Sequence, residues 1–190
     1  MPKAILSVYD KTGLVEFASG LTDLGWTLLA SGGTAKLLRD NKIEVTEVAD
    51  YTKSPEILGG RVKTLHPAVH GGLLARPNEG DRQELLNLGW DYIDLVAVNL
   101  YPFEATIAKP GVSYAEGIEN IDIGGVTLIR AAAKNHERVT LACDPADYEA
   151  ILLGLRAGGV PADIRKKLAV KGFQTTAHYD DAIYAYLAEH

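Results

Sequence analysis

Short apolar runs alternate along this chain with segments whose apolar residues recur at helical spacing. Compact apolar runs, typical of strands covered on both faces, occupy residues 4–8, 26–30, 92–103 and 138–143. Helical spacing or composition marks residues 14–24, 31–41, 81–89 and 124–136. A further strand is predicted over residues 44–50. This alternation predicts an α/β fold, with a doubly wound, mainly parallel sheet flanked by helices, in one domain spanning residues 1–190.

Two regions depart from this alternation. The stretch GGRVKTLHPAVHGG, residues 59–72, has a glycine pair at each end and Pro67 in its middle, which predicts a long loop. His66 and His70 have the spacing of a metal pair on a helix, but Pro67 interrupts such a helix, which favours structural hydrogen bonds. From Pro145 onward the chain is predicted to be helical, with breaks near residues 158–161 and near Gly172.

Composition narrows the function classes. The chain is 47% hydrophobic and 23% charged, as in an ordinary globular protein, and its formal net charge is −6. That balance argues against a nucleic-acid partner, which needs a broad cationic face, and no apolar run is long enough to span a membrane. The single cysteine, Cys143, forms no internal disulfide and no zinc-ligand spacing, which fits a reduced, cytoplasmic setting.

A phosphate site is predicted after the first two strands, because ligands of parallel sheets bind beyond the carboxyl ends of the strands. The two loops there are Tyr9-Asp10-Lys11-Thr12-Gly13 and Ser31-Gly32-Gly33-Thr34. Backbone N–H groups at a helix start, hydroxyls and the Lys11 ammonium together suit a phosphate monoester. In the plainer alternative, SGGT only caps a helix. Neither loop has the Walker or GxGxxG pattern, so ATP hydrolysis and a nicotinamide cofactor are poorly supported.

A second set of cations lies further along the chain. Arg61 and Lys63 are in the glycine-bounded stretch, and Thr127, Arg130 and Lys134 share one face of the helix predicted over 124–136. The alternative is a solvated face of an amphipathic helix. That alternative is less favoured, because the chain is acidic overall and yet each of its glycine-containing segments carries cations and hydroxyls.

Six motifs, in this order, carry a family resemblance: SVYDKTG, SGGTA, GGRVKTLHPAVHGG, NLYPF, IDIGGVTLIRAAAKNH and TTAHYDDAI. Together they resemble the inosine monophosphate (IMP) cyclohydrolase domain of the bifunctional purine-biosynthesis enzyme, whose other domain is AICAR transformylase. The resemblance spans nearly the whole chain and implies a methylglyoxal synthase-like fold, with the transformylase domain absent from this chain. The implied reaction is the dehydrative ring closure of 5-formamidoimidazole-4-carboxamide ribonucleotide (FAICAR) to IMP, with no metal and no organic cofactor. The implied partners are this purine ribonucleotide, AICAR transformylase and, in a homodimer, a second copy of the chain.

The same resemblance assigns roles to residues. It implies Lys63, Tyr101, Asp122 and Lys134 as catalytic candidates. It implies a substrate-binding set of Tyr9, Asp10, Lys11, Thr12, Ser31, Gly32, Gly33, Thr34, Arg61, Val62, Thr64, Val98, Asn99, Ile123, Gly124 and Gly125.

The chemistry of ring closure matches these residue types. A weakly nucleophilic carboxamide must lose a proton, and the formyl oxygen must receive hydrogen bonds or a proton. Lys63 and Tyr101 are suited to donate to the formyl oxygen. The backbone N–H groups of Gly124 and Gly125 could donate to it as well. Either Lys134 or Asp122 is the base. Two rival functions remain: a non-catalytic nucleotide or phosphate sensor, and methylglyoxal synthase chemistry on a triose phosphate. The RVKTLHP and AAAKNH motifs disfavour the second.

Overall fold

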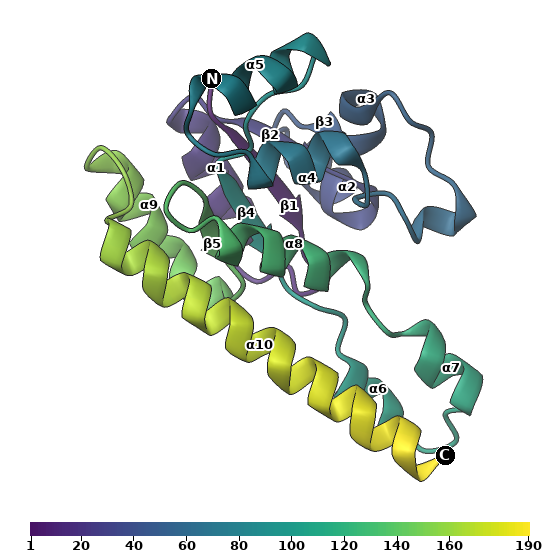
Figure 1. Cartoon of the computed structure of the whole chain (residues 1–190). Coiled ribbons are helices and arrows are strands. Elements are labelled where there is room, and N and C mark those ends of the chain that lie inside the picture. The colour runs from purple at the N-terminus through teal and green to yellow at the C-terminus, as the bar shows by residue number, and fades with distance from the viewer.

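A five-stranded, all-parallel sheet forms the centre of the molecule. The computed structural model describes the whole chain, residues 1–190 (Figure 1). The strands are β1 (Lys3–Ser7), β2 (Thr27–Ala30), β3 (Thr46–Glu47), β4 (Leu95–Val98) and β5 (Thr140–Ala142), in the order β3-β2-β1-β4-β5. Ile5 of β1 pairs with Leu29 of β2 and with Val96 of β4. The order reverses direction at β1, so the ends of β1, β2 and β4 surround one crevice, as the sequence predicts.

Helices cover both faces of this sheet. Alternate strand residues feed two separate cores: Leu6 and Leu28 enter one, and Ile5 and Leu29 enter the other. The first core is covered by α1 (Leu14–Asp23), α2 (Gly32–Asp40) and α9 (Tyr148–Arg156), and the second by α4 (Pro67–Leu74) and α8 (Gly124–Lys134). The short helix α3 (Val48–Thr52) follows β3, and α5 (Glu79–Asn87) precedes β4. The predicted doubly wound α/β fold is therefore confirmed.

A small outer lobe projects from this body. It consists of α6 (Phe103–Ile107), α7 (Tyr114–Glu119) and the C-terminal half of the long helix α10 (Ala162–Glu189) (Figure 1). α10 begins against the body, where Leu168 and Ala169 join the two cores, and ends in the lobe, where Tyr179 and Tyr186 pack around Phe103. One helix thus connects the two parts. None of the helices combines the length and apolar character needed to cross a bilayer.

Several predicted elements are corrected by the structure. Residues 44–50 do not form one strand, because only Thr46–Glu47 pair and the chain then turns into α3. The apolar run 92–103 contributes only Leu95–Val98 to the sheet. The break near Gly172 is wrong: α10 runs through it, and the missing side chain lets the helix lie close to Leu141 and Ile129. The break near residues 158–161 is confirmed.

The stretch 59–72 is also not a loop throughout. A short 3-10 turn, η1 (Leu58–Gly60), opens it, and Pro67 occupies the first turn of α4. Proline is tolerated there because a first-turn N–H has no partner within the helix. His66 caps this helix, since its Nδ1 accepts the N–H of Ala68 at 3.1 Å. His70 lies inside α4, where burial lowers its pKa and its Nε2 has no partner.

Candidate active site

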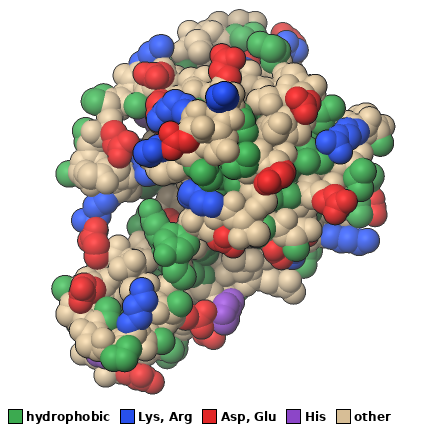
Figure 2. Space-filling model, turned by 180° about the vertical axis from the view of Figure 1, so that it is seen from behind, with side chains coloured by type: hydrophobic (Ala, Val, Ile, Leu, Met, Phe, Trp, Pro, Cys, Tyr) green, Lys and Arg blue, Asp and Glu red, His purple; other side chains and the backbone are tan.

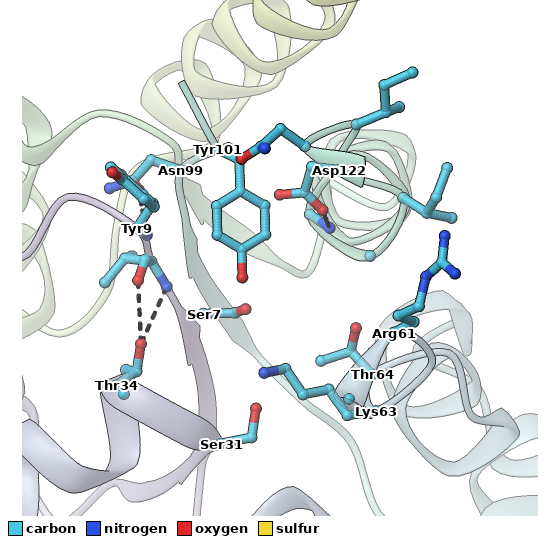
Figure 3. A pocket seen from close by; sticks show the side chains of 18 of the residues that line it. Ser7, Tyr9, Ser31, Thr34, Arg61, Lys63, Thr64, Asn99, Tyr101 and Asp122 are labelled. Atoms are coloured by element: carbon cyan, nitrogen blue, oxygen red, sulfur yellow. Dashed lines mark hydrogen bonds between the residues drawn. The ribbon is translucent and has the colours of Figure 1, made fainter. Parts of the chain in front are cut away.

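A cavity of about 540 Å³ opens at the carboxyl edge of the sheet, between the body and the outer lobe. Figure 2 shows the surface hollowed between these two parts, and Figure 3 shows the side chains that face the hollow. The predicted site residues that line it are Tyr9, Lys11, Ser31, Gly33, Thr34, Arg61, Lys63, Thr64, Asn99, Tyr101, Asp122, Ile123, Gly124 and Gly125. The structure therefore gathers segments from distant parts of the sequence around one space.

The start of α2 forms one wall of the cavity. Ser31 stands at the N-cap position, but its side chain makes no capping hydrogen bond. The N–H groups of the first turn thus keep their hydrogen-bonding capacity, and the positive end of the helix dipole faces the cavity. The Thr34 hydroxyl donates to the Val8 carbonyl at 3.2 Å, which ties the helix start to the end of β1. The alternative in which Ser31 only caps the helix does not hold here.

Lys11 reaches the same wall from the loop after β1. Its ammonium donates to the Thr34 hydroxyl at 3.2 Å and to the Val8 carbonyl. Burial lowers the pKa of Lys11, and the positive charge of Lys63 lowers it further. The Lys63 ammonium lies beside α2 as well, 3.2 Å from where a Cβ on Gly32 would be. Two like charges therefore approach one helix start, an arrangement that an anion would stabilise.

The side chain of Asn99 holds the loop that carries Lys11. Its Oδ1 accepts the N–H groups of Tyr9 and Asp10 at 2.7 and 2.9 Å, and its Nδ2 donates to the Asp10 carbonyl at 3.0 Å. The Asp10 carboxylate in turn accepts the N–H and hydroxyl of Thr12 at 2.9 and 2.7 Å, which lowers the pKa of Asp10. Asn99, Asp10 and Thr12 thus shape the loop.

The opposite wall comes from the segment before α8 and from Tyr101, which follows β4. The Asp122 carboxylate accepts the Gly125 N–H at 2.7 Å. Burial raises the pKa of Asp122, although hydrogen bonds from the Gly125 and Tyr101 backbone and the charge of Lys63 act in the opposite direction. In Figure 3 the Tyr101 hydroxyl points toward Ser7 and Lys63, with the Asp122 carboxylate beside its ring. Lys63, Tyr101 and Asp122 therefore face one space.

The loop of residues 59–64 closes the outer side of the cavity. Arg61 forms an exposed ion pair with Glu119 at the end of α7, with Nη2 and Oε2 3.4 Å apart. This contact links the loop to the outer lobe across the opening. Thr64 is buried, and its hydroxyl lies 2.8 Å from where a Cβ on Gly124 would be. The loop thus contacts both α7 and the start of α8.

Some predicted residues do not line the cavity, namely Asp10, Thr12, Gly32, Val62, Val98 and Lys134. The side chain of Val98 is completely buried in the second core and does not face the cavity, so its expected contact with the substrate stays a prediction. Lys134 is the last residue of α8 and is exposed. It lies about 15 Å along the helix axis from Gly124. The structure therefore does not bring Lys134 together with the other three catalytic candidates.

Other lining residues were missed from the sequence: Ser7, Val8, Gly59, Gly60, Glu119, Asn120 and Ile121. Ser7 and Val8 end the first predicted strand, so the rule that ligands bind at carboxyl ends was a sufficient signal for them. Glu119 to Ile121 carried no such signal, because their place depends on how the outer lobe packs. No group of three or more His, Cys, Asp or Glu side chains is arranged to hold a metal ion.

Comparison with known proteins identifies relatives of the chain. The family model described as "MGS-like domain" matches residues 13–127, and the one described as "AICARFT/IMPCHase bienzyme" matches residues 132–190. The "Bifunctional purine biosynthesis protein PurH" of Bacillus cytotoxicus is 52% identical over 189 residues, which cover 98% of this chain. PurH of Bacillus cereus gives the same values. The chain spans 37% of the length of these relatives.

A solved structure extends the likeness to three dimensions. The crystal structure of ForH superposes with a TM-score of 0.87 at 40% identity, covering 96% of this chain and 97% of that one. The predicted resemblance to the bifunctional purine enzyme and the predicted methylglyoxal synthase-like fold are both confirmed. This chain belongs to the family of MGS-like domains.

Proposed function

We propose that residues 1–190 act as an IMP cyclohydrolase domain, which closes FAICAR to IMP and water. One observation carries the proposal: Lys63, Tyr101 and Asp122 face a cavity that also contains the uncapped start of α2. The similarity to PurH over 98% of the chain supports it. The proposal extends to AICAR transformylase as the pathway partner, since that activity produces FAICAR, and to a homodimer as the assembly.

The cavity offers different chemistry at its two ends, which orients the substrate. The 5′-phosphate would bind at the start of α2, where Ser31, Thr34 and Lys11 add donors and charge to the free N–H groups. The imidazole with its formamido and carboxamide groups would then extend toward Tyr101 and Asp122. Both reacting groups are on one ring, so holding the ring still contributes much of the acceleration.

Ring closure joins the carboxamide nitrogen to the formyl carbon. The nitrogen gives up a proton to the Asp122 carboxylate, whose raised pKa makes it a better base than an exposed one. Lys63 and Tyr101 donate to the formyl oxygen as it gains charge. The carbinol C–O bond then breaks and the oxygen leaves as water, which carries the proton taken from the carboxamide and the proton that the formamido nitrogen loses as the C=N bond forms. The Gly125 N–H already binds Asp122, so of the glycine pair only the Gly124 N–H is left for the oxygen.

Lys134, the alternative base, enters the proposal through the resemblance alone, because its ammonium is exposed at the far end of α8. Asp122 is the base that the geometry favours. We expect Lys134→Ala to retain more turnover than Lys63→Ala. A larger loss in Lys134→Ala, with unchanged IMP binding, would return the base role to Lys134.

Turnover of FAICAR, followed by the ultraviolet absorbance of IMP, tests the proposal. We expect the wild type to form IMP and Lys63→Ala to lose about 100-fold in kcat. Lys166→Ala on α10, distant from the cavity, is the matched control and should retain full activity. Nucleotide binding without turnover would instead support a sensor. Release of inorganic phosphate from a triose phosphate would support methylglyoxal synthase chemistry.

A further inference from the structure

Tyr179, in the late motif TTAHYDDAI, has no role in the proposed reaction so far. It lies on α10 and is buried, with its ring edge-on to Phe103 at a centroid distance of 6.1 Å. Tyr186, further along the same helix, is equally buried and meets Phe103 at 5.6 Å. Ring packing alone therefore does not distinguish these two tyrosines of the outer lobe.

Their hydroxyl groups differ. The Tyr179 hydroxyl accepts the backbone N–H of Asp122 at 2.8 Å and donates to the carbonyl of Asn120 at 3.3 Å. Asn120 and Asp122 both line the cavity. The Tyr186 hydroxyl makes no hydrogen bond to another protein group and lies against Gly117 of α7. One tyrosine thus holds the backbone of the cavity wall, and the other only packs.

Asp122 is consequently held through both its carboxylate and its backbone N–H. Its carboxylate accepts the Gly125 N–H from the body side, and its own N–H binds Tyr179 from the lobe side. The segment between α7 and α8 has no strand partner, so these contacts set the direction of the carboxylate. An aligned general base matters because displacement of a reacting group by about 1 Å lowers rates about 100-fold.

We propose that Tyr179 is a positioning residue for Asp122, through which α10 and the outer lobe set the geometry of the cavity. This inference deepens the proposed function and rests on it for its catalytic part. The phosphate end of the cavity is built on β1, β2 and α2, away from Tyr179. Loss of the hydroxyl should therefore affect the reaction step more than nucleotide binding.

Paired variants test the role, because Tyr179→Phe and Tyr186→Phe each remove one hydroxyl from the same aromatic cluster. We expect Tyr179→Phe to lower kcat about tenfold with KM changed less than about twofold, since the hydrogen bonds of the hydroxyl to Asp122 and Asn120 are both lost. Amide hydrogen exchange at Asp122 should become about tenfold faster in this variant, in the absence of substrate. Tyr186→Phe should leave kcat, KM and this exchange rate at wild-type values.

The two measurements separate this inference from the proposed function. If Tyr179→Phe exchanges at Asp122 like Tyr186→Phe, the hydroxyl does not hold this segment and the inference is overturned. Faster exchange with an unchanged kcat would overturn the catalytic part, and so would an equal loss of kcat in both variants. If the wild type forms no IMP, the proposed function fails, while the exchange rates still decide whether Tyr179 holds Asp122.

Discussion

Two helices direct their N-termini into the cavity, and each begins with a glycine pair that comes one or two residues after a polar side chain. α2 begins with Ser31-Gly32-Gly33, and α8 follows Asp122 with Gly124-Gly125. Ser31 leaves the first turn of α2 uncapped, whereas Asp122 fills the first turn of α8 by accepting the Gly125 N–H. Similar sequences thus produce a helix start with free N–H groups on one wall and a fixed carboxylate on the other (Figure 3).

The glycines explain part of this difference. A Cβ on Gly125 would lie 2.5 Å from the Asp122 carboxylate and 2.7 Å from the Leu100 side chain, whereas a Cβ on Gly33 would meet nothing within 4 Å. Gly125 is therefore needed for close packing around Asp122. Gly33 leaves room beside the backbone of α2, as an incoming phosphate requires. The comparison teaches that a glycine pair at a helix start can either allow close packing or leave open space. The surrounding side chains decide which of the two applies.

The largest expected effect is a different kinetic consequence of substitutions in the Asp122 wall and in the Lys11 wall of the cavity. We expect Asp122→Asn to lower kcat about 100-fold, because the amide cannot accept the proton, while IMP binding changes little. Lys11→Met should do the reverse, raising the Kd for IMP about tenfold or more because a charged donor is lost. Steady-state kinetics and calorimetric titration with IMP measure both quantities. If Asp122→Asn mainly weakened binding, the assignment of the two walls would be wrong.

A smaller effect should appear in stability. Gly125→Ala is expected to reduce the free energy of unfolding by about 1–3 kcal/mol, because the methyl group overlaps Asp122 and Leu100. Gly33→Ala adds its methyl group to open space in a helix, so stability should stay the same or rise by about 0.5 kcal/mol. Urea unfolding of the two variants provides the comparison. Equal losses in both would contradict the distinction between a packed and an open helix start.

The smallest effect should be a difference in pH dependence between Asp122 and Asp10. Burial raises the folded-state pKa of Asp122 above 3.8, so its stabilising contribution is present below that pH and is lost as the pH rises through the raised pKa. Hydrogen bonds from Thr12 lower the pKa of Asp10, so its contribution is present above 3.8 and is lost as the pH falls.

Unfolding experiments on the two aspartate variants test these signs. Relative to the wild type, Asp122→Asn should therefore gain stability as the pH rises above about 4, the ordinary carboxyl pKa. Asp10→Asn should lose stability relative to the wild type as the pH rises toward about 4, and above that pH the difference should stay constant. Urea midpoints measured at several pH values give both trends, and trends of the same sign for the two variants would contradict the assigned environments.

The sequence predicted the wall that includes Lys11 and Ser31 better than the opposite wall. Both residues directly follow predicted strands, and parallel strands bring their carboxyl ends to one edge. Lys63 and Asp122 were found through motif resemblance, since no local rule places a loop or an interhelical segment over that edge. Lys134 shows a limit of motif resemblance, because its position at the end of α8 takes it away from the cavity. Val98 shows a second limit, because β4 turns its side chain into the core.

The sequence by itself determined the alternation of strands and helices, the parallel sheet and the glycine turn that starts α2, because periodicity and turn residues act over a few neighbouring positions. Only the tertiary structure decided that α10 runs unbroken into the outer lobe, that Tyr179 contacts Asp122, and that Ser31 leaves its helix uncapped. The physical reason is range. The Tyr179 hydrogen bond joins residues 57 positions apart, and such a contact depends on how whole helices pack.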